Sequence, residues 1–190
     1  MKVLTSIFCT ALMLASASFA TGAELKSGVQ PGDSIGAFDV VKCAGASDDG
    51  VDTGAKLCYR CKYGGRPMVM VFTRKADEKV AGLVKKLDSA VTHNSDAKLA
   101  AFVNLLGDNQ ESLEAEAKKF GAKTKANNVP IVVPVEYENG PDNYGLNPKA
   151  EVTVILAVKG SVVANHALSK GELNDKAIES ILADVPKLLK

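Results

Sequence analysis

The feature that most constrains the fold of this chain is a repeated switch between two hydrophobic periods. The segment RPMVMVFTR, residues 66–74, is continuously apolar at its centre, which is typical of a strand buried on both faces of a sheet. The period then becomes helical, with apolar residues at Val80, Leu83, Val84, Leu87 and Val91. This spacing predicts an amphipathic helix over 76–92. A buried strand followed by such a helix favours an α/β fold with parallel strands.

The same alternation continues toward the C-terminus. KLAAFVNLLG, residues 98–107, predicts a second buried strand. Asp108 and Glu111 resemble a capping box, which predicts a helix that begins there and ends near Gly121. VPIVVPVEY, residues 129–137, predicts a third strand, and its two prolines indicate an edge strand or a bulge.

The two ends of this alternating region add further elements. IGAFDVVKC, residues 35–43, predicts a strand before it, and residues 151–168 predict a hairpin about Lys159 and Gly160. Asn174 is the expected cap of a last helix. Together these patterns predict a single α/β domain, a mixed sheet flanked by helices.

The first twenty residues resemble a secretory signal peptide. Lys2 precedes an apolar stretch rich in small residues, and Ser18-Phe19-Ala20 fits a cleavage site. A retained membrane anchor is the alternative, but no charged flank follows Ala20, which favours removal. We therefore expect a signal peptide over 1–20 and a mature domain over 24–190, exported to the periplasm or the extracellular space, with no membrane association after cleavage.

Charge and composition restrict the partners of the mature chain. Removal of Lys2 leaves 22 Lys and Arg residues against 22 Asp and Glu residues, which argues against nucleic acid as a partner. The absence of Trp argues against a carbohydrate-stacking surface. No phosphate-binding loop, Ser-His-Asp order or paired-carboxylate motif is evident, so we expect no cofactor.

Three cysteines remain after cleavage: Cys43, Cys58 and Cys61. Outside the cytosol the expected state is one disulfide and one free thiol. In an extended strand Cys58 and Cys61 would lie about 10 Å apart, whereas a disulfide requires Cα atoms within about 7 Å. A helical turn would make this local pair feasible. The rival pairing joins Cys43 to Cys58 or Cys61 and would contribute roughly 3 kcal/mol. The connectivity stays open at this point.

Several ordered segments resemble a known family. PGDSIGAFDV (31–40), CKYGGRPMVMVF (61–72) and NYGLNPKAEVTVILAVKGSVVAN (143–165) are similar to peroxiredoxin-type members of the thioredoxin superfamily, and the resemblance covers residues 30–185. It implies a thioredoxin-like, redoxin-type sheet. Relatives carry the reactive cysteine just after the first core strand, where this chain reads TRKADEK (73–79). By this analogy, Cys58 and Cys61 lie at the amino-terminal end of that strand, opposite the usual active-site end.

Two functional hypotheses follow. In the first, the chain is an exported thiol–disulfide oxidoreductase acting on a protein thiol or disulfide through Cys58 and Cys61. Cys43 is then a resolving or structural partner, and Arg60 and Lys62 lower a thiolate pKa. In the alternative, the chain is a catalytically degenerate redoxin-like binding or structural module whose disulfide is structural.

Other candidate residues are weaker. Position 62 is Lys rather than the His of a C-x-x-C-H haem attachment site, and three cysteines do not complete a zinc site, so we expect no metal. His166 alternates with apolar residues and is expected on the sheet surface. Asp48 and Asp49 lack the spacing of a calcium loop, so we expect them to serve solubility.

Overall fold

The structure is a computed structural model that describes residues 25–190. The expected signal peptide and its cleavage site lie outside the described residues. Within the described part, no helix is long and apolar enough to cross a membrane.

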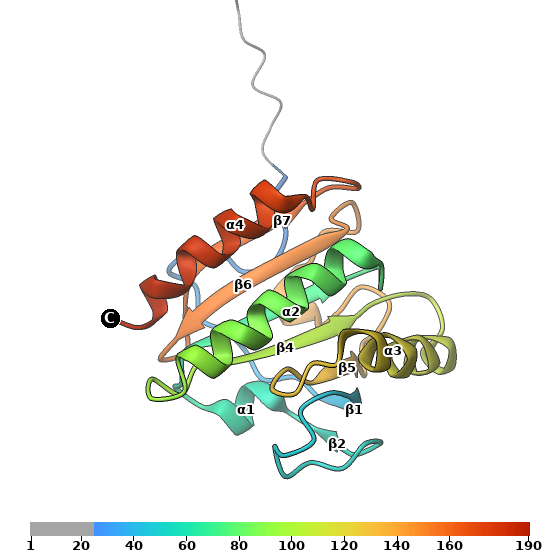
Figure 1. Ribbon diagram of the computed structural model, residues 1–190. Helices are drawn as coiled ribbons and strands as arrows, with labels where there is room; N and C mark the ends of the chain where they lie inside the picture. The colour runs from blue at the N-terminus through green and yellow to red at the C-terminus, as the bar shows by residue number, and fades with distance from the viewer. Residues whose placement is uncertain (1–24) are drawn as a thin grey trace, which may run out of the picture.

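The fold is built on one seven-stranded mixed sheet with the order β2-β1-β5-β4-β3-β6-β7 (Figure 1). The three middle strands β5, β4 and β3 are parallel, and the outer strands join them in antiparallel pairs. The strands span Val40–Ala44 (β1), Lys56–Leu57 (β2), Met68–Thr73 (β3), Ala100–Leu105 (β4), Ile131–Pro134 (β5), Val152–Val158 (β6) and Ser161–Leu168 (β7).

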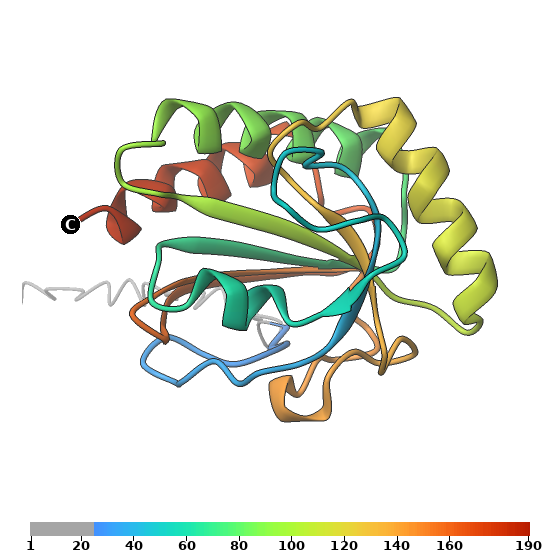
Figure 2. The same ribbon diagram turned by 90° about the horizontal axis from the view of Figure 1, so that it is seen from below.

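Helices cover both faces of this sheet. One face carries α2 (Glu78–His93), α3 (Gln110–Thr124) and α4 (Asp175–Asp184), the last followed by the 3-10 turn η2 (Val185–Leu188). The short helix α1 (Tyr59–Tyr63) lies against the opposite face, together with the chain before β1 and the turn η1 (Asp142–Tyr144) (Figure 2). The predicted mixed sheet between helical layers is confirmed.

The strands divide the hydrophobic core into two parts. On β3, Val69 and Val71 belong to the core beneath α2, α3 and α4, whereas Met68, Met70 and Phe72 belong to the core beneath α1. Every residue of β3 and β4 is buried, because both faces of these central strands are covered. This double burial explains why their sequences read as continuous apolar runs.

Side-chain caps mark the starts of α2, α3 and α4, and the cap predicted for the last helix, Asn174, is confirmed. Asp77 caps α2 by accepting hydrogen bonds from the backbone N–H groups of Lys79 and Val80, and Asn174 caps α4. The predicted capping box was wrong by one residue, because the cap of α3 is Asn109, which accepts from the N–H of Ser112 at 2.9 Å.

The expectation that the third strand lies at an edge was wrong. β5 lies between β1 and β4, with Pro130 just before it and Pro134 as its last residue. The two prolines therefore bracket the strand without removing a hydrogen-bond donor from its middle. The bulge is in the partner strand β1, between Lys42 and Ala44. The predicted hairpin is confirmed, and Lys159 and Gly160 adopt the positive φ angles that a tight turn between β6 and β7 requires.

Candidate thiol–disulfide site

Cys58 and Cys61 form a disulfide at the beginning of α1. Their Cα atoms lie 5.2 Å apart, because the chain turns from extended backbone at Cys58 into a helical turn. Cys58 is the cap of this helix, and its Sγ accepts a hydrogen bond from the backbone N–H of Cys61 at 3.0 Å. Of the pairings left open by the sequence, the structure has the local one.

The sheet register places this disulfide at a different end from the one expected by analogy. Leu57 on β2 pairs with Val40 on β1, and Val40 pairs with Pro134, the last residue of β5. Cys58 therefore lies at the carboxyl end of the parallel strands. The analogy was wrong because α1 runs back along the sheet before the chain enters β3 (Figure 2). The pair lies at the end of the sheet where the resemblance placed a reactive cysteine, but laterally, near the β1–β2 edge.

A cavity of about 370 Å³ opens beside the disulfide. Its walls come from the chain just before β1, from the segment just after β5, and from the two cysteines themselves. They comprise Ala37, Phe38, Asp39, Cys58, Cys61, Val135, Glu136 and Pro141. Val135 is 43% exposed, the only large hydrophobic residue among the described positions that is so exposed. Val135 therefore gives the cavity an exposed apolar wall beside the disulfide.

The charged residues around this cavity are acidic. Asp39 pairs with Lys56 at 3.5 Å, and Glu136 accepts a hydrogen bond from the N–H of Asp142 at 2.7 Å. Lys62 instead lines a separate hollow on the other side of α1. Arg60 extends toward the β6–β7 turn, where its guanidinium lies beside Gly160. The two basic residues flanking the pair in sequence therefore do not line its cavity.

The helix that carries the cysteines is held to the sheet by two tyrosines. Tyr59 is fully buried, and its ring stacks on Phe102 of β4 with centroids 5.8 Å apart. Tyr63 packs on the same ring at 6.0 Å. Burial raises the pKa of both phenols, and for Tyr59 the hydrogen bond to Asp49 adds to the effect. These hydroxyls therefore stay protonated at physiological pH.

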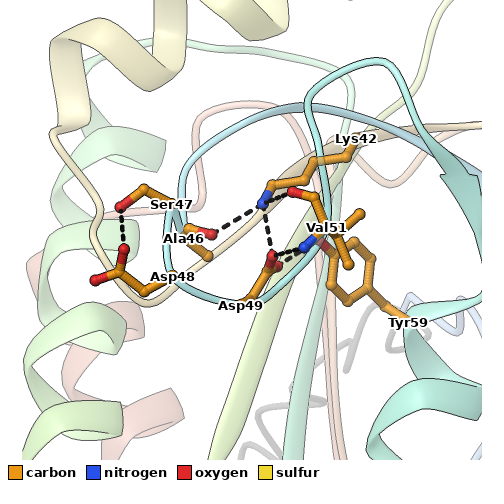
Figure 3. Close-up of polar contacts among 7 residues, drawn as sticks. All are labelled: Lys42, Ala46, Ser47, Asp48, Asp49, Val51 and Tyr59. Carbon is orange, nitrogen blue, oxygen red and sulfur yellow. Dashed lines mark hydrogen bonds and ion pairs between the residues drawn. The ribbon is translucent and has the colours of Figure 1, made fainter.

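A buried ion pair connects α1 to the loop between β1 and β2 (Figure 3). The ammonium of Lys42 donates to the carbonyls of Ala46 and Val51, both at 2.8 Å, and to Asp49 Oδ1 at 2.7 Å. Asp49 also accepts from the N–H of Val51 at 2.9 Å and from the hydroxyl of Tyr59 at 2.6 Å. Because all three ammonium protons have an acceptor, the buried charge is fully compensated.

Sequence reasoning missed this network. Asp49 was expected to serve solubility together with Asp48, but its side chain is only 13% exposed and carries the ion pair. Asp48 does lie exposed beside it and accepts from the hydroxyl of Ser47 at 3.2 Å. The sequence held no signal that separates the two aspartates, because the difference depends on contacts of Asp49 with Lys42 and Tyr59 that only the folded chain creates.

The structure does not bring Cys43 to the other two cysteines. It is unpaired and buried in the core beneath α3, on the opposite face of the sheet from α1. Burial raises the pKa of its thiol to about 11, with a further contribution from Glu114. To form a disulfide with Cys58 or Cys61, the side chain of Cys43 would have to reach the opposite face of the sheet. This would require β1 to rotate about its own axis.

The start of α2, where the resemblance placed a reactive cysteine, is occupied by other contacts. Asp77 satisfies the N–H groups at the start of α2, which a thiolate would otherwise use. Arg74 donates from Nη1 to the carbonyl of Glu138 at 2.8 Å and so connects the turn after β3 to the segment after β5. The start of α2 therefore carries polar contacts in place of a reactive thiol.

The two histidines lie far from the disulfide in the fold. His166 lies on β7, as expected, and its Nε2 lies 3.0 Å from Asp184 at the end of α4. His93 lies at the last turn of α2, where its Nδ1 contacts the carbonyl of Ser89 at 2.6 Å. Among residues 25–190, no group of three or more His, Cys, Asp or Glu side chains is arranged to hold a metal ion.

The likeness of this chain to known proteins lies in its structure. No protein-family profile matches this chain, and no curated protein is similar to it in sequence. A putative thiol:disulfide interchange protein DsbE from Chlorobium tepidum superposes with a TM-score of 0.64 at 14% identity, covering 85% of this chain and 99% of that one. The fold is thioredoxin-like, of the redoxin type.

Two other structures support this assignment of the redoxin-type fold. A putative protein disulfide isomerase from Bacteroides thetaiotaomicron matches at 17% identity with a TM-score of 0.57, covering 87% of this chain and 94% of its own. Mycobacterium tuberculosis AhpC matches at 12% identity with a TM-score of 0.60, covering 85% and 99%. At these identities the likeness establishes the fold, and any activity must be argued from the site.

Proposed function

We propose that this protein is an exported thiol–disulfide oxidoreductase in which Cys58 and Cys61 alternate between a disulfide and a dithiol. The observation that carries the proposal is a solvent-accessible C-x-x-C disulfide in a helical turn beside a cavity. Accessibility is what separates exchangeable disulfides from inert ones, because an attacking thiolate must reach one of the sulfurs. The signal-like sequence of residues 1–20 supports export, and an exported location favours disulfide chemistry.

The local disulfide adds little as a structural staple. Closing a four-residue loop contributes only about 2 kcal/mol by the chain-entropy relation. Moreover, α1 is already held by the buried rings of Tyr59 and Tyr63 and by the hydrogen bond from Tyr59 to Asp49. The fold therefore does not depend on this crosslink to position α1, which favours a chemical role for it.

The proposed partner is a protein that presents a cysteine thiol or a disulfide on an exposed segment. The cavity beside the pair has apolar walls from Phe38, Val135 and Pro141, which suit a side chain next to the partner's cysteine. The near-zero mature charge gives no support for nucleic acid or an anionic membrane surface as the partner.

The test is catalysis of disulfide exchange in a peptide that contains two cysteines and changes fluorescence on oxidation. The purified oxidised protein should convert the dithiol peptide to its disulfide, and variants C58S and C61S should each lose this activity. The matched control is Cys43→Ala, which should keep the activity because Cys43 lies in the other core.

A protein that shows no exchange above the uncatalysed rate would contradict the proposal and favour the alternative, a catalytically degenerate binding or structural module. That alternative makes its own prediction: the double variant C58S/C61S would lose stability but no activity.

A further inference from the structure

The two cysteines of the disulfide are presented unequally to the solvent. Cys61 is exposed together with Lys62, whereas Cys58 is half-buried. Cys58 is followed directly by Tyr59, which is fully buried and hydrogen-bonded to Asp49 (Figure 3). The first residues of the turn are thus held against the sheet, and Cys61 lies on the side of the turn that faces outward.

The hydrogen bonding of the two sulfurs is also unequal. The Sγ of Cys58 accepts the backbone N–H of Cys61 at 3.0 Å. Hydrogen bonding to the charged form stabilises it, so a thiolate at Cys58 would keep a donor already in place. Thiol–disulfide exchange is faster when the attacked sulfur is accessible and the departing sulfur has the lower pKa. Accessibility and hydrogen bonding therefore select the same direction of attack.

We propose that Cys61 is the sulfur that exchanges with the substrate and that Cys58 is the departing, resolving sulfur, an assignment that rests on the proposed function. A substrate thiolate attacks the Sγ of Cys61, and the Cys58–Cys61 bond breaks. Cys58 leaves as a thiolate whose Sγ still accepts the hydrogen bond from the backbone N–H of Cys61. The product is a mixed disulfide between the substrate and Cys61.

A second thiolate of the substrate then attacks the substrate sulfur of this mixed disulfide and releases Cys61 as a thiolate. The substrate has lost two electrons and two thiol protons and gained a disulfide. The protein has gained the two electrons, and its two thiolates take up protons from water. Return to the oxidised form requires an external disulfide, either a disulfide-bonded protein or oxidised glutathione.

The cavity is consistent with this order. Both cysteines line it, so a substrate attached to the exposed Cys61 can place its neighbouring residues against Phe38 and Val135. Cys58 lines the same cavity but is half-buried, so its sulfur is the less accessible of the two. In this order the substrate attacks the second cysteine of C-x-x-C, which is the exposed one, and not the first.

The direct test uses the chain's own sequence. The oxidised protein is mixed with excess reduced glutathione and quenched in acid within milliseconds, and the glutathionylated site is mapped. Cleavage after Arg60 separates Cys58 and Cys61 onto different peptides. Glutathione should be found on Cys61 in excess of Cys58 by about 10-fold or more, and an excess on Cys58 would overturn the assignment.

A second measurement gives an answer even if the mixed disulfide is too short-lived to trap. In a Cys43→Ala background, the reduced variants C58S and C61S are each reacted with oxidised glutathione. The rate constant of each variant is then divided by its rate constant with iodoacetamide, a smaller reagent. The normalised rate should be about 10-fold higher in C58S, which retains Cys61. An equal or higher value in C61S would refute the order.

The two proposals fail in distinguishable ways. If peptide oxidation is absent but Cys61 is still the faster sulfur, the oxidoreductase proposal fails and the assignment of the accessible sulfur stands. If peptide oxidation is present and glutathione is found on Cys58, the function stands and the order of attack is wrong.

Discussion

Replacing Asp49 by Asn tests whether the buried network holds α1 in place. The substitution keeps the size of the side chain but removes its charge, so the ammonium of Lys42 loses its counter-ion while its side chain stays only 2% exposed. Removing one partner of a buried ion pair costs roughly 3 to 5 kcal/mol. Asp49 is 13% exposed, and the carbonyls of Ala46 and Val51 still accept hydrogen bonds from Lys42 in the variant. We therefore expect a loss of stability at the lower end of this range, about 3 kcal/mol.

The assay is urea unfolding of the oxidised protein at pH 7, followed by circular dichroism, with the free energy of unfolding taken by linear extrapolation. For a domain of this size, a loss of about 3 kcal/mol should also lower Tm by about 6 to 12 °C. The matched control is Asp48→Asn. It removes the same charge from the neighbouring exposed position and should change stability by less than about 0.5 kcal/mol.

A double variant makes this test sharper. Replacing Lys42 by Met together with Asp49 by Leu removes both charges, so the double variant should cost less than the two single changes added together. The reasoning would be refuted if D49N cost less than 1 kcal/mol or if D48N cost as much as D49N. Either result would mean that the ion pair does not hold the loop against α1.

Three further predictions concern other parts of the molecule. The thiol of Cys43 should resist iodoacetamide at pH 8 in the native protein and react fully in urea, since burial raises its pKa to about 11; rapid native labelling would contradict this. Burial raises the pKa of Asp184, but hydrogen bonds from Lys187 and His166 outweigh it and leave the pKa below its usual value. The extra stability of the wild type over Asp184→Asn should therefore be present above about pH 4 and vanish at lower pH, as acid unfolding curves would show; a pH-independent difference would refute it. Gly121→Ala should destabilise by about 1 to 3 kcal/mol, because a Cβ there would overlap the side chain of Ala44. The control for this change is Gly82→Ala, at a half-buried position of α2 with open space around it, which should stabilise by up to about 1 kcal/mol in urea unfolding.

Sequence patterns located the central elements because their signals are local. The strand predicted over 66–74 is Met68–Thr73, and the helix predicted over 76–92 is Glu78–His93. In both cases burial on the sheet determines which residues are apolar, so the period is visible in the chain. The edge position predicted for β5 was wrong because strand order depends on long-range pairing, which prolines at the ends of a strand do not reveal.

The site was predictable only in part. The spacing of Cys58 and Cys61 identified the pair, since a helical turn is the conformation that lets residues three apart form a disulfide. Its surroundings were not predictable, because Asp39 and Glu136 reach the cavity from segments about 100 residues apart in the chain. Basic neighbours in sequence, Lys62 among them, point elsewhere, since successive residues of a helical turn face different directions.

The most direct test of the central claim is the reduction potential of the Cys58–Cys61 disulfide. The Cys43→Ala variant would be equilibrated with glutathione buffers of known ratio, and the fraction of free thiol on the pair would be counted by alkylation and mass spectrometry. If the pair cycles, its potential should lie in the range of catalytic dithiols, roughly −270 to −120 mV. A pair that stays oxidised in every buffer, with a potential below about −300 mV, would contradict the account and identify the disulfide as structural.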